Sequence, residues 1–142
     1  MRKTFKSQSG VSLLEIMLVL AIAALIIVMS IRFYQSAADS NKVNAGLNTI
    51  QAVVAAAESS ITAIGNTSNT ANYLPGGVLP NSPWGGAVTM VDSGASLTYT
   101  IKMPVPGGDA TKPCEKLEAF LETNTKFAAT CSGTSISVVV TP

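Results

Sequence analysis

The stretch Gly10-Val11-Ser12-Leu13-Leu14-Glu15 separates a short basic leader from a long apolar segment. The leader, residues 1–10, is polar and too short to fold alone. The segment that follows, residues 11–31, is interrupted only by Ser12, Glu15 and Ser30. Its length is close to the roughly 20 residues that an α-helix needs to cross a bilayer. The sequence therefore predicts a membrane-spanning helix that carries one carboxylate near its start.

The charges are distributed unevenly on the two sides of Gly10. The chain has nine basic and eight acidic residues; three of the basic ones and none of the acidic ones lie in the leader, so six basic and eight acidic residues follow it. Because a basic flank tends to stay on the cytoplasmic side of a membrane, the C-terminal part is predicted to lie outside. Arg32, Phe33 and Tyr34 follow the apolar run, a pattern typical of a membrane–water boundary.

An ordinary secretory signal peptide is an alternative for the same segment. Such peptides also have a basic start and an apolar run, followed by a site with small residues. Ser36-Ala37-Ala38 could provide that site. The apolar run is long for a signal peptide, and Glu15 is out of place at its start, so the membrane-spanning interpretation is favoured.

The helix is expected to continue beyond the membrane, because no proline occurs between Met1 and Leu74. Apolar residues recur at steps of four and three, which is a helical stripe. Its members are Val43, Leu47, Ile50, Val54, Ala57, Ile61 and Ile64. The stripe could form a coiled coil, but a helix that covers one side of a sheet is the favoured interpretation. One helix over residues 11–64 would be about 80 Å long.

The rest of the chain predicts a small antiparallel sheet. A polar, turn-rich connection begins at Gly65, and we expect Trp84 to pack this connection against the core. Strands are predicted at residues 87–91 and 97–103 with a turn at Asp92-Ser93-Gly94, and at residues 127–131 and 135–141 with a turn at Ser132-Gly133-Thr134. A short helix is predicted at residues 113–123. Its buried face should hold Cys114, Leu117, Phe120 and Leu121, and its solvated face Glu115, Glu118 and Glu122.

Composition narrows the possible functions. The formal net charge of +1 argues against a strongly basic nucleic-acid-binding surface. The chain has no histidine, the commonest general base and metal ligand, and no nucleophile–base pair or phosphate-binding loop is recognisable. We therefore expect no enzyme, no metal and no cofactor. Cys114 and Cys131 are an even pair in the part predicted to be exported, so a disulfide is predicted between them.

Gly10, the apolar Val11, Ser12-Leu13-Leu14, Glu15 and the apolar run behind them resemble the N-terminus of the type IV prepilins. Residues 33–42 are similar to the same region of type IVb pilins such as those of bundle-forming pili. The resemblance implies cleavage after Gly10 by a prepilin peptidase and N-methylation of Val11. It also implies the type IV pilin fold, an α+β fold in which a long N-terminal helix packs on a C-terminal antiparallel sheet.

Four segments follow from this resemblance. Residues 1–10 are a removable leader, residues 11–34 a transmembrane and filament-core half of the helix, residues 35–64 its amphipathic half, and residues 65–142 a globular head. Glu15 has two possible roles: it could complement the positive end of its own helix, or pair with the Val11 amine of a neighbouring subunit during assembly. The second role is favoured mostly on the resemblance, and the cost of a carboxylate at membrane depth also points to a function.

The expected function is that of a major pilin. It would sit in the inner membrane with its N-terminus in the cytoplasm and then polymerise into an extracellular filament for adhesion, aggregation or DNA transfer. Its expected partners are copies of itself, the prepilin peptidase, the inner-membrane assembly machinery and, before assembly, membrane lipid. Three alternatives stay open: a minor pilin, a pseudopilin of type II secretion, and a membrane-anchored binding domain that never polymerises.

Overall fold

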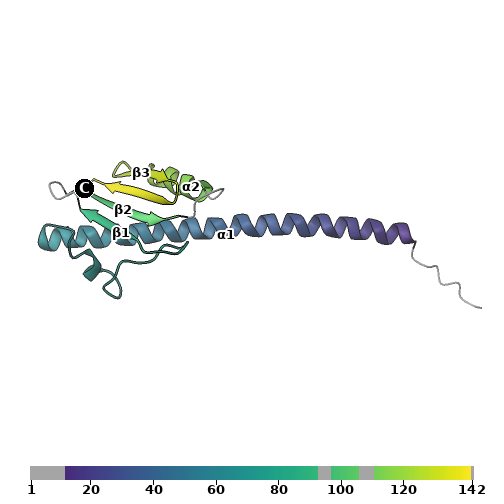
Figure 1. Ribbon diagram of the computed structural model, residues 1–142, viewed down its shortest axis with the longest axis horizontal. Helices are drawn as coiled ribbons and strands as arrows, with labels where there is room; N and C mark the ends of the chain where they lie inside the picture. The colour runs from purple at the N-terminus through teal and green to yellow at the C-terminus, as the bar shows by residue number, and fades with distance from the viewer. Residues whose placement is uncertain (1–11, 93–96, 106–110, 142) are drawn as a thin grey trace, which may run out of the picture. The chain divides into compact units, whose positions relative to one another are not determined.

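The computed structural model describes residues 12–92, 97–105 and 111–141. They form a long N-terminal helix followed by a four-stranded antiparallel sheet, so the predicted α+β class is confirmed (Figure 1). The elements in order are α1 (Leu13–Ile64), the 3₁₀ helix η1 (Thr70–Tyr73), β1 (Thr89–Asp92), β2 (Tyr99–Pro104), α2 (Thr111–Leu121), β3 (Phe127–Ser132) and β4 (Ser135–Val140). The chain divides after Ala37 into two compact units. The second, residues 38–142, is called the C-terminal unit below.

Helix α1 is unbroken over 52 residues, close to the predicted range of 11–64. It begins where the carbonyl oxygen of Ser12 accepts hydrogen bonds from the backbone N–H groups of Glu15 (2.9 Å) and Ile16 (3.2 Å). Val11 lies outside the described residues. The helix ends at Gly65, whose φ of 78° is left-handed and whose N–H donates to the carbonyl of Ile61 at 2.8 Å. This is an αL C-cap, for which glycine is the usual residue.

The sheet has the order β1-β2-β4-β3, and all its neighbouring strands are antiparallel. The two predicted hairpins, β1–β2 and β3–β4, are confirmed, and β4 also pairs with β2. Strand β1 begins two residues later than predicted. Leu97 was expected in the second strand but precedes it and is exposed. Of the predicted turn between these strands, Ser93 and Gly94 lie outside the described residues.

One face of the sheet is buried and the other is open. Tyr99, Ile101 and Met103 alternate along β2, and their cross-strand partners on β4 are Val140, Val138 and Ile136. All six are buried. The residues between them on these strands, such as Lys102 and Ser137, are exposed or half-buried. The sheet therefore requires a cover on one face only, which helices α1 and α2 provide.

The cover from α1 is the predicted apolar stripe, widened by buried residues outside the predicted stripe. Val43, Ile50, Val54 and Ala57 are buried as predicted, and Leu47 and Ile61 are half-buried against the core. Ile64 is exposed, contrary to prediction, because α1 ends there. The buried face also includes Gly46, Val53, Ala56 and Ser60. The stripe is used within the chain, so the interpretation of a helix covering a sheet is confirmed.

The polar connection between α1 and β1 is fixed by buried hydroxyl groups. Ser60 on α1 donates its hydroxyl to the carbonyl of Asn66 at 2.8 Å. Further along, Ser82 donates its hydroxyl to the carbonyl of Pro104 at 2.6 Å, at the end of β2. Trp84 is half-buried and packs against the core beside Gly46, as the sequence predicted.

Candidate functional site

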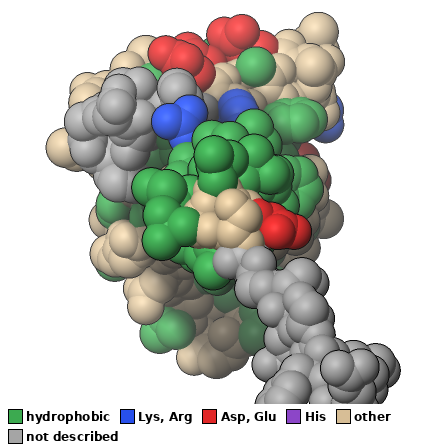
Figure 2. Space-filling view, turned by 90° about the vertical axis from the view of Figure 1, so that its right-hand side faces the viewer, with side chains coloured by type: hydrophobic (Ala, Val, Ile, Leu, Met, Phe, Trp, Pro, Cys, Tyr) green, Lys and Arg blue, Asp and Glu red, His purple; other side chains and the backbone are tan. Residues whose placement is uncertain are grey.

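The N-terminal half of α1, residues 13–34, exposes nearly every large hydrophobic side chain it has. Leu13 is 77% exposed, Met29 71% and Phe33 78%. Hydrophobic side chains cover the end of this helix that faces the viewer in Figure 2. Among the described residues, α1 is the one helix that is long and apolar enough to span a membrane. Exposed apolar area of this kind is unfavourable in water, at roughly 25 cal/mol per Å², so it requires lipid or protein contacts.

Glu15 lies in the first turn of α1 and is exposed. Together with Ile16, Val19 and Leu20 it lines a shallow apolar hollow on the helix surface. The carboxylate is therefore exposed beside apolar side chains of its own helix, while its backbone N–H belongs to the positively polarised start of the helix. Gly10 and Val11, the predicted cleavage and methylation positions, lie outside the described residues. The structure therefore places one predicted site residue, Glu15, at the start of an apolar helix surface.

The other polar groups of this half-helix suit an apolar surrounding. Ser30 donates its hydroxyl to the carbonyl of Ile26 at 2.8 Å, so its donor is satisfied within the helix. Such a bond lets a hydroxyl lie in hydrocarbon without an unpaired donor. Arg32, Phe33 and Tyr34 follow and are exposed. Glu15 is thus the one acidic residue described before Arg32.

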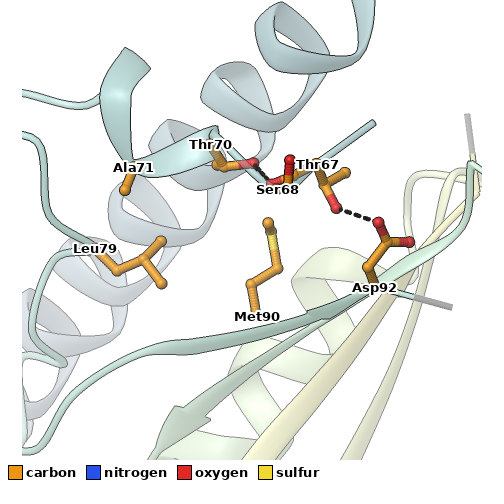
Figure 3. A pocket seen from close by; sticks show the side chains of 7 residues that line it. All are labelled: Thr67, Ser68, Thr70, Ala71, Leu79, Met90 and Asp92. Carbon is orange, nitrogen blue, oxygen red and sulfur yellow. Dashed lines mark hydrogen bonds between the residues drawn. The ribbon is translucent and has the colours of Figure 1, made fainter. Parts of the chain in front are cut away.

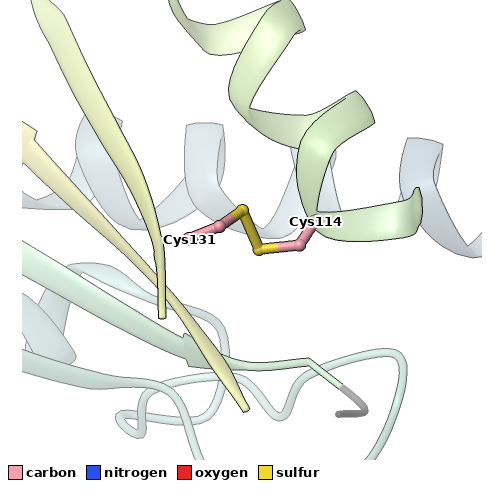
Figure 4. The surroundings of a disulfide bond; sticks show 2 residues. All are labelled: Cys114 and Cys131. Carbon is pink, nitrogen blue, oxygen red and sulfur yellow. A yellow bond between two sulfur atoms is a disulfide. The ribbon is translucent and has the colours of Figure 1, made fainter. Parts of the chain in front are cut away.

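The C-terminal unit contains the predicted disulfide, between Cys114 in α2 and Cys131 in β3 (Figure 4). The two Cα atoms are 6.0 Å apart, and the residues are 17 positions apart in the chain. Since β3 is an edge strand, the bond fixes α2 to the edge of the sheet. Of the predicted buried face of α2, Cys114, Leu117 and Leu121 are buried, but Phe120 is 57% exposed. Phe120 lies three residues after Leu117 and one before Leu121, and both of those already point into the core.

A second hollow, of about 200 Å³, lies between the start of the connection and β1 (Figure 3). Thr67 donates its hydroxyl to the Asp92 carboxylate at 2.9 Å, and Thr70 donates to the carbonyl of Thr67 at 2.7 Å. Met90 and Leu79 supply its apolar walls. The bond from Thr67 to Asp92 joins the connection to β1, and the bond from Thr70 to Thr67 holds the connection itself. The hydroxyl groups of Thr67 and Thr70 therefore have a structural role here.

Sequence reasoning missed these buried threonines, because a Ser/Thr-rich connection after a helix is usually a solvated loop. The only available signal was their proximity to the C-cap glycine, where short polar side chains often bond to the backbone.

Among the described residues, no group of three His, Cys, Asp or Glu side chains is placed to hold a metal ion. Comparison with known protein families, curated proteins and solved structures found no match.

Proposed function

We propose that this protein is a pilin, a structural subunit of a type IV pilus. The observation that carries the proposal is the half-helix of residues 13–34, which is exposed and apolar around its circumference. It carries Glu15 in its first turn, four residues after Val11. A surface of this kind suits lipid before assembly and the packed helices of other copies afterwards. The subunit therefore starts as a single-pass inner-membrane protein with its N-terminus in the cytoplasm.

Cleavage after Gly10 by a prepilin peptidase would create an amine at Val11 and remove the cations of the leader. Glu15 would then lie about one turn from a positive charge, in an apolar surrounding where unlike charges attract strongly. Within one chain this pair complements the helix dipole. Between chains the same attraction would align a new subunit along the helix axis, so that its Glu15 meets the Val11 amine of a neighbour. We favour the second arrangement, because it couples cleavage to assembly.

The C-terminal unit supplies the filament surface in this proposal. Its sheet, the α2 helix and the Cys114–Cys131 disulfide would face an oxidising exterior, where disulfides persist. Repeated contacts that do not close on themselves generate an open helical polymer. The inner-membrane assembly machinery would extract each subunit from lipid. The biological role of such a filament would be adhesion, aggregation or DNA transfer, and no catalysis is proposed.

N-terminal sequencing and intact mass of the protein from cells test the first step. The expected mature chain begins at a methylated Val11. A mature chain that retains Met1, or that begins after Ala38 as a secretory cleavage would produce, contradicts the proposal. Abundance of the protein in sheared surface fractions separates a major pilin from a minor pilin or a secretion pseudopilin, and the cysteine pair favours a pilin.

Replacing Glu15 with alanine tests the assembly step. Glu15→Ala is expected to leave a cleaved, membrane-inserted protein that forms no filaments. The matched control is Glu122→Ala, which removes an exposed carboxylate just after α2 and should leave filament yield unchanged. Normal filaments from Glu15→Ala would refute the role of Glu15. A wild-type protein that is cleaved but never appears in filaments would instead favour a membrane-anchored binding domain.

A further inference from the structure

Asn66 is an exposed asparagine at the start of the connection that follows α1. It comes directly after Gly65, and Ser68 stands two residues beyond it. Asn66-Thr67-Ser68 therefore matches the acceptor motif for N-linked glycosylation, which is Asn-x-Ser/Thr with a middle residue other than proline. Asn66 is the one asparagine in the sequence that meets this pattern. Because a three-residue motif arises easily by chance, its local geometry decides whether the match is informative.

The amide oxygen of Asn66 is held by Ser68. It accepts one hydrogen bond from the Ser68 backbone N–H at 3.1 Å and a second one from the Ser68 hydroxyl at 2.5 Å. Both bonds go to Oδ1, so the amide nitrogen Nδ2 is the open end of the side chain, and it has no hydrogen-bond partner among the described residues. The nitrogen that would carry a sugar is therefore unpaired on an exposed side chain, next to the hydroxyl that the motif requires.

The backbone and the middle residue of the motif are anchored to the fold. Thr67 is buried and donates its hydroxyl to the Asp92 carboxylate at 2.9 Å (Figure 3). Ser60 donates its hydroxyl to the backbone carbonyl of Asn66 at 2.8 Å. Neither bond uses the side-chain amide of Asn66, so a sugar attached to Nδ2 would leave both intact. A Cβ atom placed on the adjacent Gly65 would meet nothing within 4 Å, which indicates open space beside the acceptor.

We propose that Asn66 is a site of N-linked glycosylation, modified after the C-terminal unit has crossed the membrane. The donor class is an oligosaccharide carried on a lipid diphosphate, and its bulky, hydrophilic sugars suit the exposed position of Asn66. This inference rests on the export step of the proposed function, because a surface sugar of this kind belongs to a secreted part of a chain. It does not require filament assembly, so a membrane-anchored protein that never polymerises would carry the same site.

The transfer replaces one bond of the donor sugar with a bond to Asn66. Nδ2 bonds to the anomeric carbon of the first sugar, the bond from that carbon to the diphosphate oxygen breaks, and the lipid diphosphate leaves with the electron pair. Nδ2 gives one of its protons to a base of the glycosyltransferase that binds the donor. The bonds from Ser68 to Oδ1 assist this step, because hydrogen bonds to an atom that gains negative charge favour loss of the proton.

Mass spectrometry of the mature chain, purified from the cells that produce it, tests the modification. The proteolytic peptide that contains Asn66 is expected to carry the mass of a glycan, and fragmentation should place that mass on Asn66. Asn66→Gln, which lengthens the acceptor side chain, and Ser68→Ala, which removes the hydroxyl, should both abolish the added mass. Ser68→Thr keeps a hydroxyl and should retain it. The matched control Asn69→Gln changes an exposed asparagine outside the motif and should leave the glycan unchanged.

The outcomes separate this inference from the pilin proposal. An unmodified Asn66 overturns the glycosylation, and where that chain begins at Val11 the pilin proposal still stands. Added mass that persists in Asn66→Gln, or that fragmentation places on Ser68, also overturns it. A chain glycosylated at Asn66 that does not begin at Val11 supports the site and counts against the pilin proposal. Both motif side chains are exposed, so each variant is expected to fold, and an intact Cys114–Cys131 disulfide checks this.

Discussion

Gly46 on α1 lies directly against the indole ring of Trp84. A Cβ atom placed on Gly46 would be 3.1 Å from Cζ3 and 3.2 Å from Cη2 of that ring, and 3.3 Å from the terminal methyl of Met103. These distances are shorter than ordinary van der Waals contact, so the glycine allows the helix to approach the connection and β2 closely. A glycine in a helix costs about 1 kcal/mol relative to alanine. In this helix that cost is offset by the packing of Trp84.

Gly46→Val is therefore expected to destabilise the C-terminal unit by about 1–3 kcal/mol, the usual cost of overpacking a core. The measurement is denaturant unfolding of the mature chain in detergent, followed by the fluorescence of Trp84, the only tryptophan. Ala45→Val is the matched control, because Ala45 is the exposed neighbour on the same helix. It should cost no more than the roughly 0.5 kcal/mol difference in helix propensity. Equal losses in both variants would show that the Trp84 contact contributes nothing.

The relation between Gly46 and Trp84 also shows where sequence reasoning stopped. Hydropathy predicted the stripe through Ile50 and Ala57, and alternation predicted β2, because apolar periodicity reports directly on burial. Gly46 and Ser60 carry no such signal, although both are on the buried face. Their burial depends on what the connection brings to them, namely the Trp84 ring and the carbonyl of Asn66. The apolar periodicity of one helix cannot reveal which side chains of another segment will pack against it.

The candidate site shows a similar division. Glu15 and the apolar run were recognisable because a carboxylate at the start of such a segment is rare and costly. The position of Phe120 was predicted wrongly, because a 3–4 spacing allows two adjacent apolar residues to compete for one face. Leu117 and Leu121 take the buried positions of α2. The hollow lined by Thr67 and Asp92 was not predictable, since it forms between segments whose packing only the folded chain defines.

The Cys114–Cys131 disulfide should stabilise the C-terminal unit by restricting its unfolded state. For a loop with a sequence separation of 17, the chain-entropy model gives about 3 kcal/mol. The double variant Cys114→Ala, Cys131→Ala is expected to lose stability of this order in denaturant unfolding. Treatment with a reductant should destabilise the wild type to a similar degree and leave the double variant unchanged. A wild type whose unfolding is insensitive to reduction would contradict this expectation.

Tyr99 is buried in the core, and its hydroxyl finds no hydrogen-bond partner among the described residues. Burial raises the pKa of Tyr99 to about 12, with a smaller contribution from the negative charge of Glu58. An unpaired buried hydroxyl is costly, so Tyr99→Phe should not destabilise the protein at pH 7 and could stabilise it by about 1 kcal/mol. Denaturant unfolding at neutral pH measures this, and a loss of more than 1 kcal/mol would indicate an important partner for the hydroxyl.

The same variant has a predictable effect at high pH. The folded state keeps the Tyr99 proton up to a pKa of about 12, whereas the unfolded chain releases it near its ordinary value of 10.0. The folded state therefore binds more protons between these values, and stability falls as the pH rises through this window. Wild type should lose roughly 1–3 kcal/mol between pH 10 and 12 that Tyr99→Phe does not lose. Parallel curves for the two proteins would contradict the raised pKa.

Two isoleucines on α1 test whether one helix has two different environments. Ile50 is fully buried in the core of the C-terminal unit, whereas Ile22 is 51% exposed on the apolar half. Ile50→Ala should reduce the free energy of unfolding by about 2–5 kcal/mol, because it leaves a cavity in a packed core. Ile22→Ala, the same substitution in the same helix, should leave the unfolding of the detergent-solubilised subunit unchanged, since no core surrounds that side chain.

The two variants should exchange their effects when the filament is measured. If the apolar half of α1 is covered by neighbouring copies, Ile22→Ala removes contacts that exist only after assembly, so its filaments should dissociate more readily than wild type. Ile50→Ala should lower the amount of folded subunit but leave the contacts at Ile22 intact in those that assemble. Equal filament stability for Ile22→Ala and wild type would mean that residue 22 faces no neighbour. That result would limit helix-to-helix packing to other positions on the half-helix.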